Sequence, residues 1–148
     1  GRIQSNKTAE ISRYFQWVHG LDRLKHAERL SRQRPEQLPP LQVCIQVNLS
    51  GEASKGGVVP QDLAALATAV ARMPRLRLRG LMTMPDPDAS TRIQRETFAT
   101  LRGLLDELRA DGLELDTLSM GMSADMEAAI AEGSTIVRIG TDIFGRRD

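Results

Sequence analysis

The sequence predicts an α/β fold in which strands and helices alternate around a parallel sheet. From residue 41 onward, short apolar or β-branched runs alternate with longer stretches whose apolar residues recur at helical spacing. The chain has 148 residues, 41% of them hydrophobic, which is enough for one buried core. No linker or low-complexity segment interrupts this pattern. We therefore expect residues 1–148 to form a single domain.

The elements after residue 40 follow directly from the alternation. We expect strands at 41–49, 76–84, 117–120 and 135–144, and helices at 60–73, 91–110 and 123–132. Pro60 suits the first turn of a helix, and Pro74 cannot continue one. Asp111 and Gly112 are typical of a helix end.

The first forty residues continue the same rhythm. We expect helices at 8–16 and 22–33, a strand at 17–21, and the end of a further strand at 1–3. Pro39 and Pro40 indicate the loop into the next strand. The sequence therefore predicts five strands and the end of a sixth.

Composition excludes several classes of protein. Twenty basic and nineteen acidic residues give a net charge of +1, which argues against a nucleic-acid surface and requires any anion site to be local. The single cysteine, Cys44, cannot form an internal disulfide, which favours a reducing, cytoplasmic location. Its apolar surroundings indicate a buried structural thiol rather than a nucleophile. No run approaches the ~20 apolar residues of a membrane span, so we expect no membrane partner.

Ser123 is the first candidate binding residue. It follows a strand end and a glycine turn, at the expected N-terminus of the helix 123–132. Backbone N–H groups at a helix N-terminus and a serine hydroxyl can together bind an anion. The alternative is that Ser123 only caps its own helix.

Arg138, Gly140 and Thr141 form the second candidate group. Arg138 interrupts an apolar run, so its guanidinium needs a partner. The alternative to a ligand is a carboxylate on a neighbouring strand or helix. Gly140 permits close approach of a ligand, and Thr141 adds a hydroxyl. Because the carboxyl ends of parallel strands lie side by side, Ser123, Gly140 and Thr141 are expected to converge on a phosphate.

Five segments resemble one known family. They are GRIQSNKT, IQVNLSGEASKGG, RLRGLMTMP, LSMGMSADMEAAIAEGST and VRIGTDIFGRRD. In this order they closely resemble the pyridoxal phosphate homeostasis protein family, also called YggS or PROSC. The resemblance covers essentially the whole chain. It implies a (β/α)8 TIM-like barrel of the alanine racemase N-terminal type, with pyridoxal 5′-phosphate (PLP) at the barrel mouth.

The resemblance also implies roles for individual residues. Arg138 would face the pyridine nitrogen of PLP, while Ser123, Gly140 and Thr141 would hold the phosphate. Met82 would lie near the ring, with a plain core methionine as the alternative. The function implied is non-catalytic PLP binding in intracellular PLP homeostasis.

Two other functions stay open at this point. One is a PLP-dependent amino-acid racemase, which usually needs a second acid/base group such as a tyrosine, and Tyr14 is the only tyrosine. The other is a phosphate-binding barrel that does not use PLP.

The resemblance places only barrel strands 4–8 and the end of strand 3 in this chain, as in an N-terminally truncated fragment. The family's Schiff-base lysine would lie upstream of Gly1, so we assign no catalytic residue. Lys7, Lys25 and Lys55 lack the matching context, and Lys7 and Lys55 are expected to be solvated at the barrel mouth. The expected alternatives for the missing strands are a separate or cleaved chain, a disordered segment, or a swapped second copy. His19 and His26 show no metal-ligand spacing, and His19 is expected to be a structural hydrogen-bonding residue.

Overall fold

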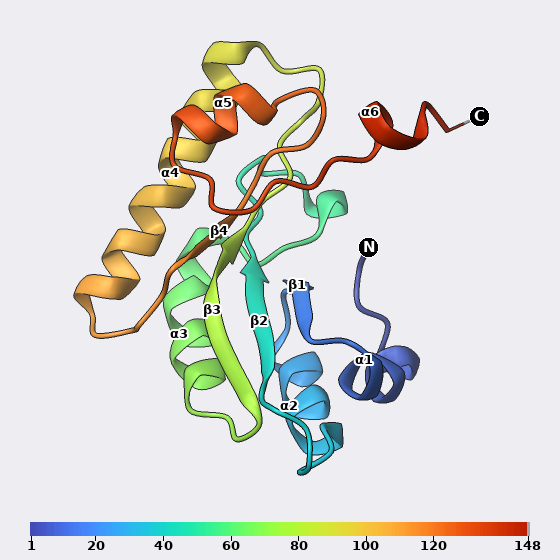
Figure 1. The fold of residues 1–148 in the computed structure, drawn as a ribbon. Helices are drawn as coiled ribbons and strands as arrows, with labels where there is room; N and C mark the ends of the chain where they lie inside the picture. Colours follow the sequence, from blue (N-terminus) through green and yellow to red (C-terminus); the bar gives the residue numbers. More distant parts are fainter. Residues whose placement is uncertain (148) are drawn as a thin grey trace.

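A computed structural model describes residues 1–147, and its centre is one parallel sheet. The strands are β1 (Trp17–Leu21), β2 (Leu41–Gln46), β3 (Leu76–Met82) and β4 (Thr117–Ser119). They are hydrogen-bonded in the order β1-β2-β3-β4, and every pair is parallel (Figure 1). Spatial order therefore equals chain order, as in an α/β barrel. Asp148, at the end of the last motif, lies outside the described residues.

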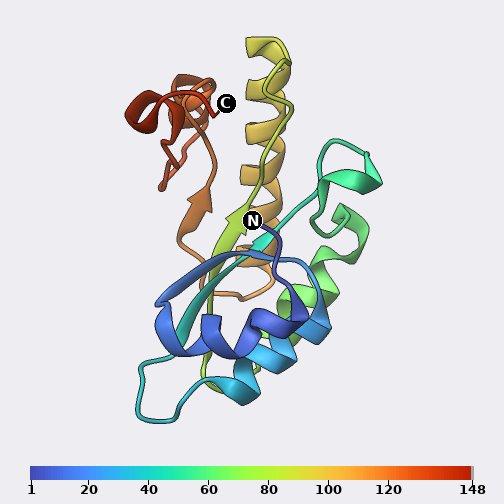
Figure 2. The same cartoon turned by 90° about the vertical axis from the view of Figure 1, so that its right-hand side faces the viewer.

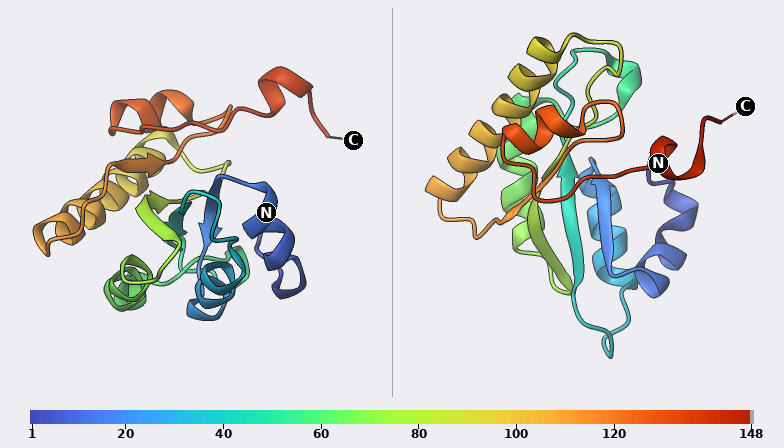
Figure 3. Two further views of the ribbon diagram at one scale, coloured as in Figure 1. Left: turned by 60° about the horizontal axis from the view of Figure 1, so that its bottom comes forward. Right: turned by 45° about the horizontal axis from the view of Figure 1, so that its top comes forward.

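Within residues 1–147, three helices connect successive strands, one precedes β1, and two follow β4. The helices are α1 (Thr8–Tyr14), α2 (Leu24–Gln33), α3 (Pro60–Ala71), α4 (Thr91–Ala110), α5 (Met126–Ala131) and α6 (Thr141–Phe144), with 3-10 turns η1 (Ser5–Lys7) and η2 (Ala53–Lys55). The curved sheet has α2, α3 and α4 on its outer side (Figure 3). In the part of the chain described, no helix combines the length and apolarity that crossing a membrane requires.

The hydrophobic core lies between the sheet and these outer helices. Leu41, Val43 and Ile45 alternate along β2 and are fully buried, because alternate side chains of a strand point to the same face. One face of α3 belongs to the same buried cluster and consists of Leu63, Leu66, Ala67 and Val70. Phe98 of α4 completes this layer with no exposed surface.

Two elements have the predicted bounds, β1 and α4. Ser90 caps α4 by accepting a hydrogen bond from the N–H of Ile93 at 3.3 Å. At the other end Gly112 adopts φ +101°, and Leu113 donates to the carbonyl of Leu108 at 3.2 Å. This is a Schellman ending, which requires a left-handed residue and so favours glycine.

The predicted strand at 135–144 is wrong. Ile136 makes a single bridge with Ser119, and the chain then runs irregularly to α6. The Ser134 hydroxyl bonds to the carbonyl of Met120 at 2.6 Å, and the Thr135 hydroxyl accepts from the N–H of Leu118 at 2.8 Å. Side chains thus take the backbone groups that a longer ladder would use.

The predicted helix at 123–132 begins later, at Met126. The Asp125 carboxylate accepts from the N–H of Met122 at 2.6 Å and holds residues 123–125 in a turn. Asp125, not Ser123, occupies the N-cap position, so the prediction that Ser123 caps this helix is wrong. The described chain accordingly has four strands rather than five, and residues 1–3 are not a strand.

The remaining ends differ by one to three residues. The predicted elements 8–16, 22–33, 41–49, 60–73, 76–84 and 117–120 are observed as α1, α2, β2, α3, β3 and β4 with the bounds given above. The strands lose their last residues where the loops at the carboxyl edge begin. Such shifts are ordinary at element ends, where regular hydrogen bonding frays.

Cys44 lies on β2 and is fully buried, as predicted. Burial raises the pKa of its thiol to about 12. The thiolate is the reactive form, so we expect no reaction with Ellman's reagent at mildly alkaline pH while the protein is folded. Addition of denaturant should release one equivalent of reactive thiol per chain. Rapid labelling of the folded protein would contradict the burial of this side chain.

Candidate functional site

The carboxyl ends of the four strands meet at one edge of the sheet. The segment from the end of β4 through α5 to α6 passes across this edge (Figure 1), and Figure 2 shows the same segment from the side. Ligands of parallel α/β folds bind at this edge, because the loops there can vary without disturbing the sheet.

Arg138 is held at this edge by oxygen atoms at the ends of β3 and β4. Its Nη1 donates to the Ser119 carbonyl at 2.9 Å and to the Ser119 hydroxyl at 2.6 Å, and its Nη2 donates to the Thr83 carbonyl at 3.2 Å. Its own N–H donates to Gly121 O at 2.8 Å. The need for partners is confirmed, but the partners in the described chain are a hydroxyl and carbonyls. Burial lowers the pKa of this guanidinium, which still stays charged at neutral pH.

His19 and Ser119 extend this network toward β1. His19 Nδ1 lies 2.6 Å from the Ser119 hydroxyl, which the same Arg138 also contacts. Burial, followed by the charge of Arg138, lowers the pKa of His19. His19 is a hydrogen-bonding residue, as predicted. Ser119 was not among the predicted site residues. The available signal was the position of Ser119 as the last strand residue before the glycine turn.

Ser123 and the start of α6 come together as predicted. The N–H of Asp142 donates to the Ser123 hydroxyl at 3.2 Å, although 19 residues separate them. Gly140 immediately precedes α6, and a Cβ placed on it would meet no atom within 4 Å. Thr141 is the first residue of α6 and is exposed. The structure therefore brings Ser123, Gly140 and Thr141 together at a solvent-accessible position beside the start of α6.

Met82 is the last residue of β3 and is only 5% exposed. It lies in register with Gln46 of β2 and Ser119 of β4. Its main-chain neighbour Thr83 carries the carbonyl that binds Arg138. Met82 is thus beside the Arg138 network and also a core residue, so the position is compatible with both of its predicted roles.

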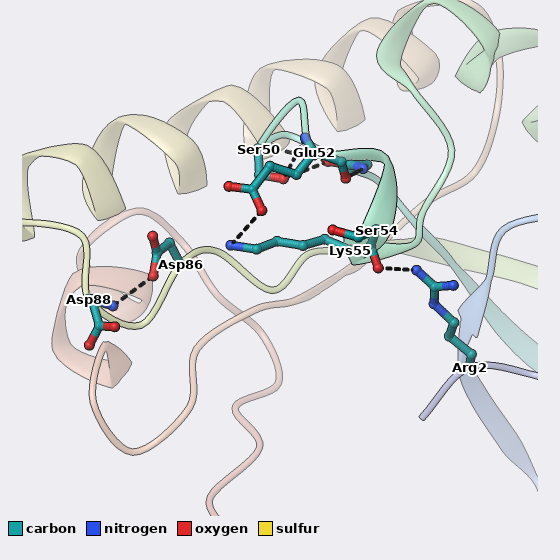
Figure 4. A network of polar contacts seen from close by, with 8 residues as sticks. Arg2, Ser50, Glu52, Ser54, Lys55, Asp86 and Asp88 are labelled. Atoms are coloured by element: carbon teal, nitrogen blue, oxygen red, sulfur yellow. Dashed lines mark hydrogen bonds and ion pairs between the residues drawn. The ribbon is translucent and has the colours of Figure 1, made fainter.

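The lysines near this edge pair with nearby glutamates. Lys55 Nζ lies 3.8 Å from Glu52, and its side chain is 33% exposed. Figure 4 shows Lys55 beside Glu52, with Arg2 reaching the carbonyl of Ser54. Lys7 Nζ lies 4.0 Å from Glu10 and is more exposed. Such exposed pairs contribute little to stability.

A second polar cluster lies toward the amino ends of β1 and β4. Arg79 binds Asp116 through two hydrogen bonds of 3.0 and 2.7 Å, and its guanidinium lies 4.8 Å from the centre of the Trp17 ring. The hydrogen bond from Arg79 lowers the pKa of Asp116 to about 2. Within residues 1–147, no group of three His, Cys, Asp or Glu side chains could hold a metal ion.

A family model described as "Alanine racemase, N-terminal domain" matches residues 1–148. The chain belongs to this family. The alanine racemase N-terminal domain is a TIM-barrel-like fold, so the predicted fold class is confirmed, as are the parallel sheet and its alternating helices.

Curated relatives within the family carry one name, pyridoxal phosphate homeostasis protein. The Pseudomonas aeruginosa relative is 64% identical over all 148 residues, and the Escherichia coli K12 relative is 52% identical. The predicted resemblance is therefore confirmed. The chain spans 63% of the length of each of these two relatives.

Solved structures of other proteins have a similar fold over nearly the whole chain. PipY of Synechococcus elongatus PCC7942 with PLP bound is 35% identical, with a TM-score of 0.90 over 98% of this chain and 68% of that one. An alanine racemase of Clostridium difficile 630 has a TM-score of 0.77 at 15% identity, over 99% of this chain and 38% of that one. The racemase shares the fold alone.

Proposed function

We propose that the protein binds PLP at the carboxyl edge of its sheet and takes part in cytoplasmic PLP homeostasis without catalysing a reaction. The single observation that carries this proposal is the anchoring of the Arg138 guanidinium at the ends of β3 and β4, beside the solvent-accessible position at Ser123 and Thr141. The names of the curated relatives and the PLP in PipY support the choice of ligand.

The donors at this edge fit PLP. Ser123 accepts a hydrogen bond from Asp142, so its own proton is available to a phosphate oxygen. Gly140 leaves space for the phosphate, and Thr141 adds a second hydroxyl. Arg138 would face the ring nitrogen, with Met82 near the ring.

When bound, PLP supplies an aldehyde that reacts with amines and a ring that withdraws electrons. Arg138 stays cationic, so it opposes protonation of the ring nitrogen and weakens that withdrawal. This arrangement suits storage or transfer of the cofactor better than catalysis.

We also propose that residues 1–148 act as one domain whose sheet is completed by further strands. Within the described chain β1 pairs only with β2, which leaves a row of free backbone groups along its other edge. Strands from the same protein, a separate chain or a second copy could pair there.

Replacement of Arg138 by methionine is expected to weaken PLP binding at least about tenfold, because a charged hydrogen-bond donor is lost. Arg138→Lys should also bind weakly, since an ammonium cannot reproduce the three contacts of the guanidinium. Binding to the native protein can be followed by quenching of Trp17, the only tryptophan.

The matched control is Arg109→Met, on the exposed last turn of α4. Wild-type affinity is expected for this control. Equal affinity in Arg138→Met and wild type would refute the assigned role of Arg138.

Two further measurements separate the competing functions. Incubation of the native protein with L-alanine is expected to give no D-alanine, and sustained formation would establish a racemase. A full-length protein that supplies the family's Schiff-base lysine is expected to show a near-visible absorbance band with PLP, which borohydride removes. Residues 1–148 alone are expected to form no stable aldimine. Binding of inorganic phosphate without binding of PLP would favour a phosphate-binding barrel of another function.

A further inference from the structure

The hydroxyl of Ser119 lies between two nitrogen atoms from distant parts of the chain. Arg138 Nη1 and His19 Nδ1 each lie 2.6 Å from its oxygen. Ser119 ends β4 and has no exposed surface, so its position is fixed by the sheet. His19 lies on β1, which does not pair with β4. The contact therefore connects the two outermost strands of the sheet across its inner side.

Arg138 depends on such anchors because its own segment is irregular. Residues 137–140 belong to no strand or helix, and the guanidinium is oriented by Ser119 and by the Thr83 carbonyl. A long side chain on irregular backbone has many rotamers, and each hydrogen bond removes some of that freedom. The Ser119 hydroxyl is the only side-chain atom that binds Arg138 within the described residues.

The donors and acceptors in this network determine the direction of the hydrogen bond between Ser119 and His19. Arginine only donates, so the Ser119 oxygen accepts from Arg138 and keeps its own proton. Burial lowers the pKa of His19, so the imidazole is neutral at neutral pH. Its Nδ1 can then accept the Ser119 proton, with the ring proton on Nε2. This direction points the lone pairs of Ser119 toward Arg138.

We propose that His19 and Ser119 are positioning residues that orient the Arg138 guanidinium toward the ring-nitrogen end of the bound ligand. This inference rests on the proposed function, because it concerns the same PLP site. Ser119 contacts Arg138 directly, and His19 acts on Arg138 only through the Ser119 hydroxyl. Neither residue is assigned any contact with the phosphate end. The alternative is that the hydrogen bond between His19 and Ser119 only stabilises the arrangement of β1 and β4.

Comparison of two ligands distinguishes a role of His19 and Ser119 in positioning Arg138 from a purely structural role. PLP presents a ring nitrogen to Arg138, whereas 1-deaza-PLP has a C–H group there and keeps the phosphate and the aldehyde. Wild type is expected to prefer PLP over the deaza analogue. Ser119→Ala should reduce that preference about tenfold, the usual effect of losing a hydrogen bond to a charged group. Affinity for inorganic phosphate should not change.

The His19 variants test the other half of the network. His19→Leu should reduce the ligand preference in the same direction as Ser119→Ala. His19→Asn should restore most of it, because the asparagine amide can lie near the position of Nδ1 and accept the same proton. Arg109→Met is the control for the titration. If Ser119→Ala does not fold, Ser119→Cys and the His19 pair supply the same comparison.

The outcomes are distinct. An equal loss of affinity for both ligands in Ser119→Ala and His19→Leu would overturn the inference and leave a structural link between β1 and β4. An unchanged preference in folded variants would also overturn it. A wild-type protein that binds neither PLP nor its analogue would instead refute the proposed function itself. A selective loss of the PLP preference, restored in His19→Asn, supports the inference.

Discussion

Replacement of Gly80 by alanine is expected to destabilise the protein by about 3 kcal/mol or more, the upper range for overpacking of a buried site. A Cβ on Gly80 would lie 1.7 Å from the carbonyl oxygen of Thr117 and 2.6 Å from its carbonyl carbon. Both atoms belong to the backbone of β4, so no side-chain rotation can relieve the overlap. The variant must separate β3 from β4 or move the start of β4.

The measurement is equilibrium unfolding in denaturant, followed by circular dichroism. Gly103→Ala is the matched control, since a Cβ on Gly103 would meet nothing within 4 Å. Gly103 lies inside α4, so alanine should stabilise the protein by up to about 1 kcal/mol. Similar unfolding midpoints for the two variants would contradict the close contact of β3 and β4.

Local sequence patterns predicted the elements whose causes are local. The bounds of α4 were found because the apolar period and the Asp111-Gly112 ending act within a few residues. The strand expected at 135–144 failed for a non-local reason. Ile136 bridges only to Ser119, and the hydroxyls of Ser134 and Thr135 bind backbone groups of the segment around β4.

Some residues of the candidate site were predicted and Ser119 was not, again because its contacts are distant in the sequence. Arg138 was conspicuous because a charge interrupts an apolar run, and Ser123 and Thr141 flank glycine turns. Their convergence followed from the rule that parallel strands share a carboxyl edge. Ser119 gave no comparable signal, because a serine at a strand end is common. Its importance arises from contacts with His19, 100 residues away, and Arg138, 19 residues away.

Arg34 shows the same limitation in the interior of the protein. In the sequence it stands in a polar stretch before Pro35 and resembles an exposed loop residue, yet it is only 4% exposed. Its Nη1 donates to the carbonyls of Ser12 and Phe15, each at 2.7 Å, and its Nε donates to the carbonyl of Pro39 at 2.9 Å. The side chain thus closes the C-terminal end of α1, where helix carbonyls lack partners, and fixes the loop before β2.

Replacement of Arg34 by methionine is therefore expected to destabilise the protein by about 3 kcal/mol, because buried carbonyls without donors are costly. Methionine fills most of the space of the arginine stem, so the loss reports hydrogen bonds rather than a cavity. Arg32→Met, on the exposed side of the last turn of α2, should change stability by less than about 0.5 kcal/mol. Denaturant unfolding of both variants gives the comparison. Equal stability of the two would mean that water satisfies these carbonyls as well as Arg34 does.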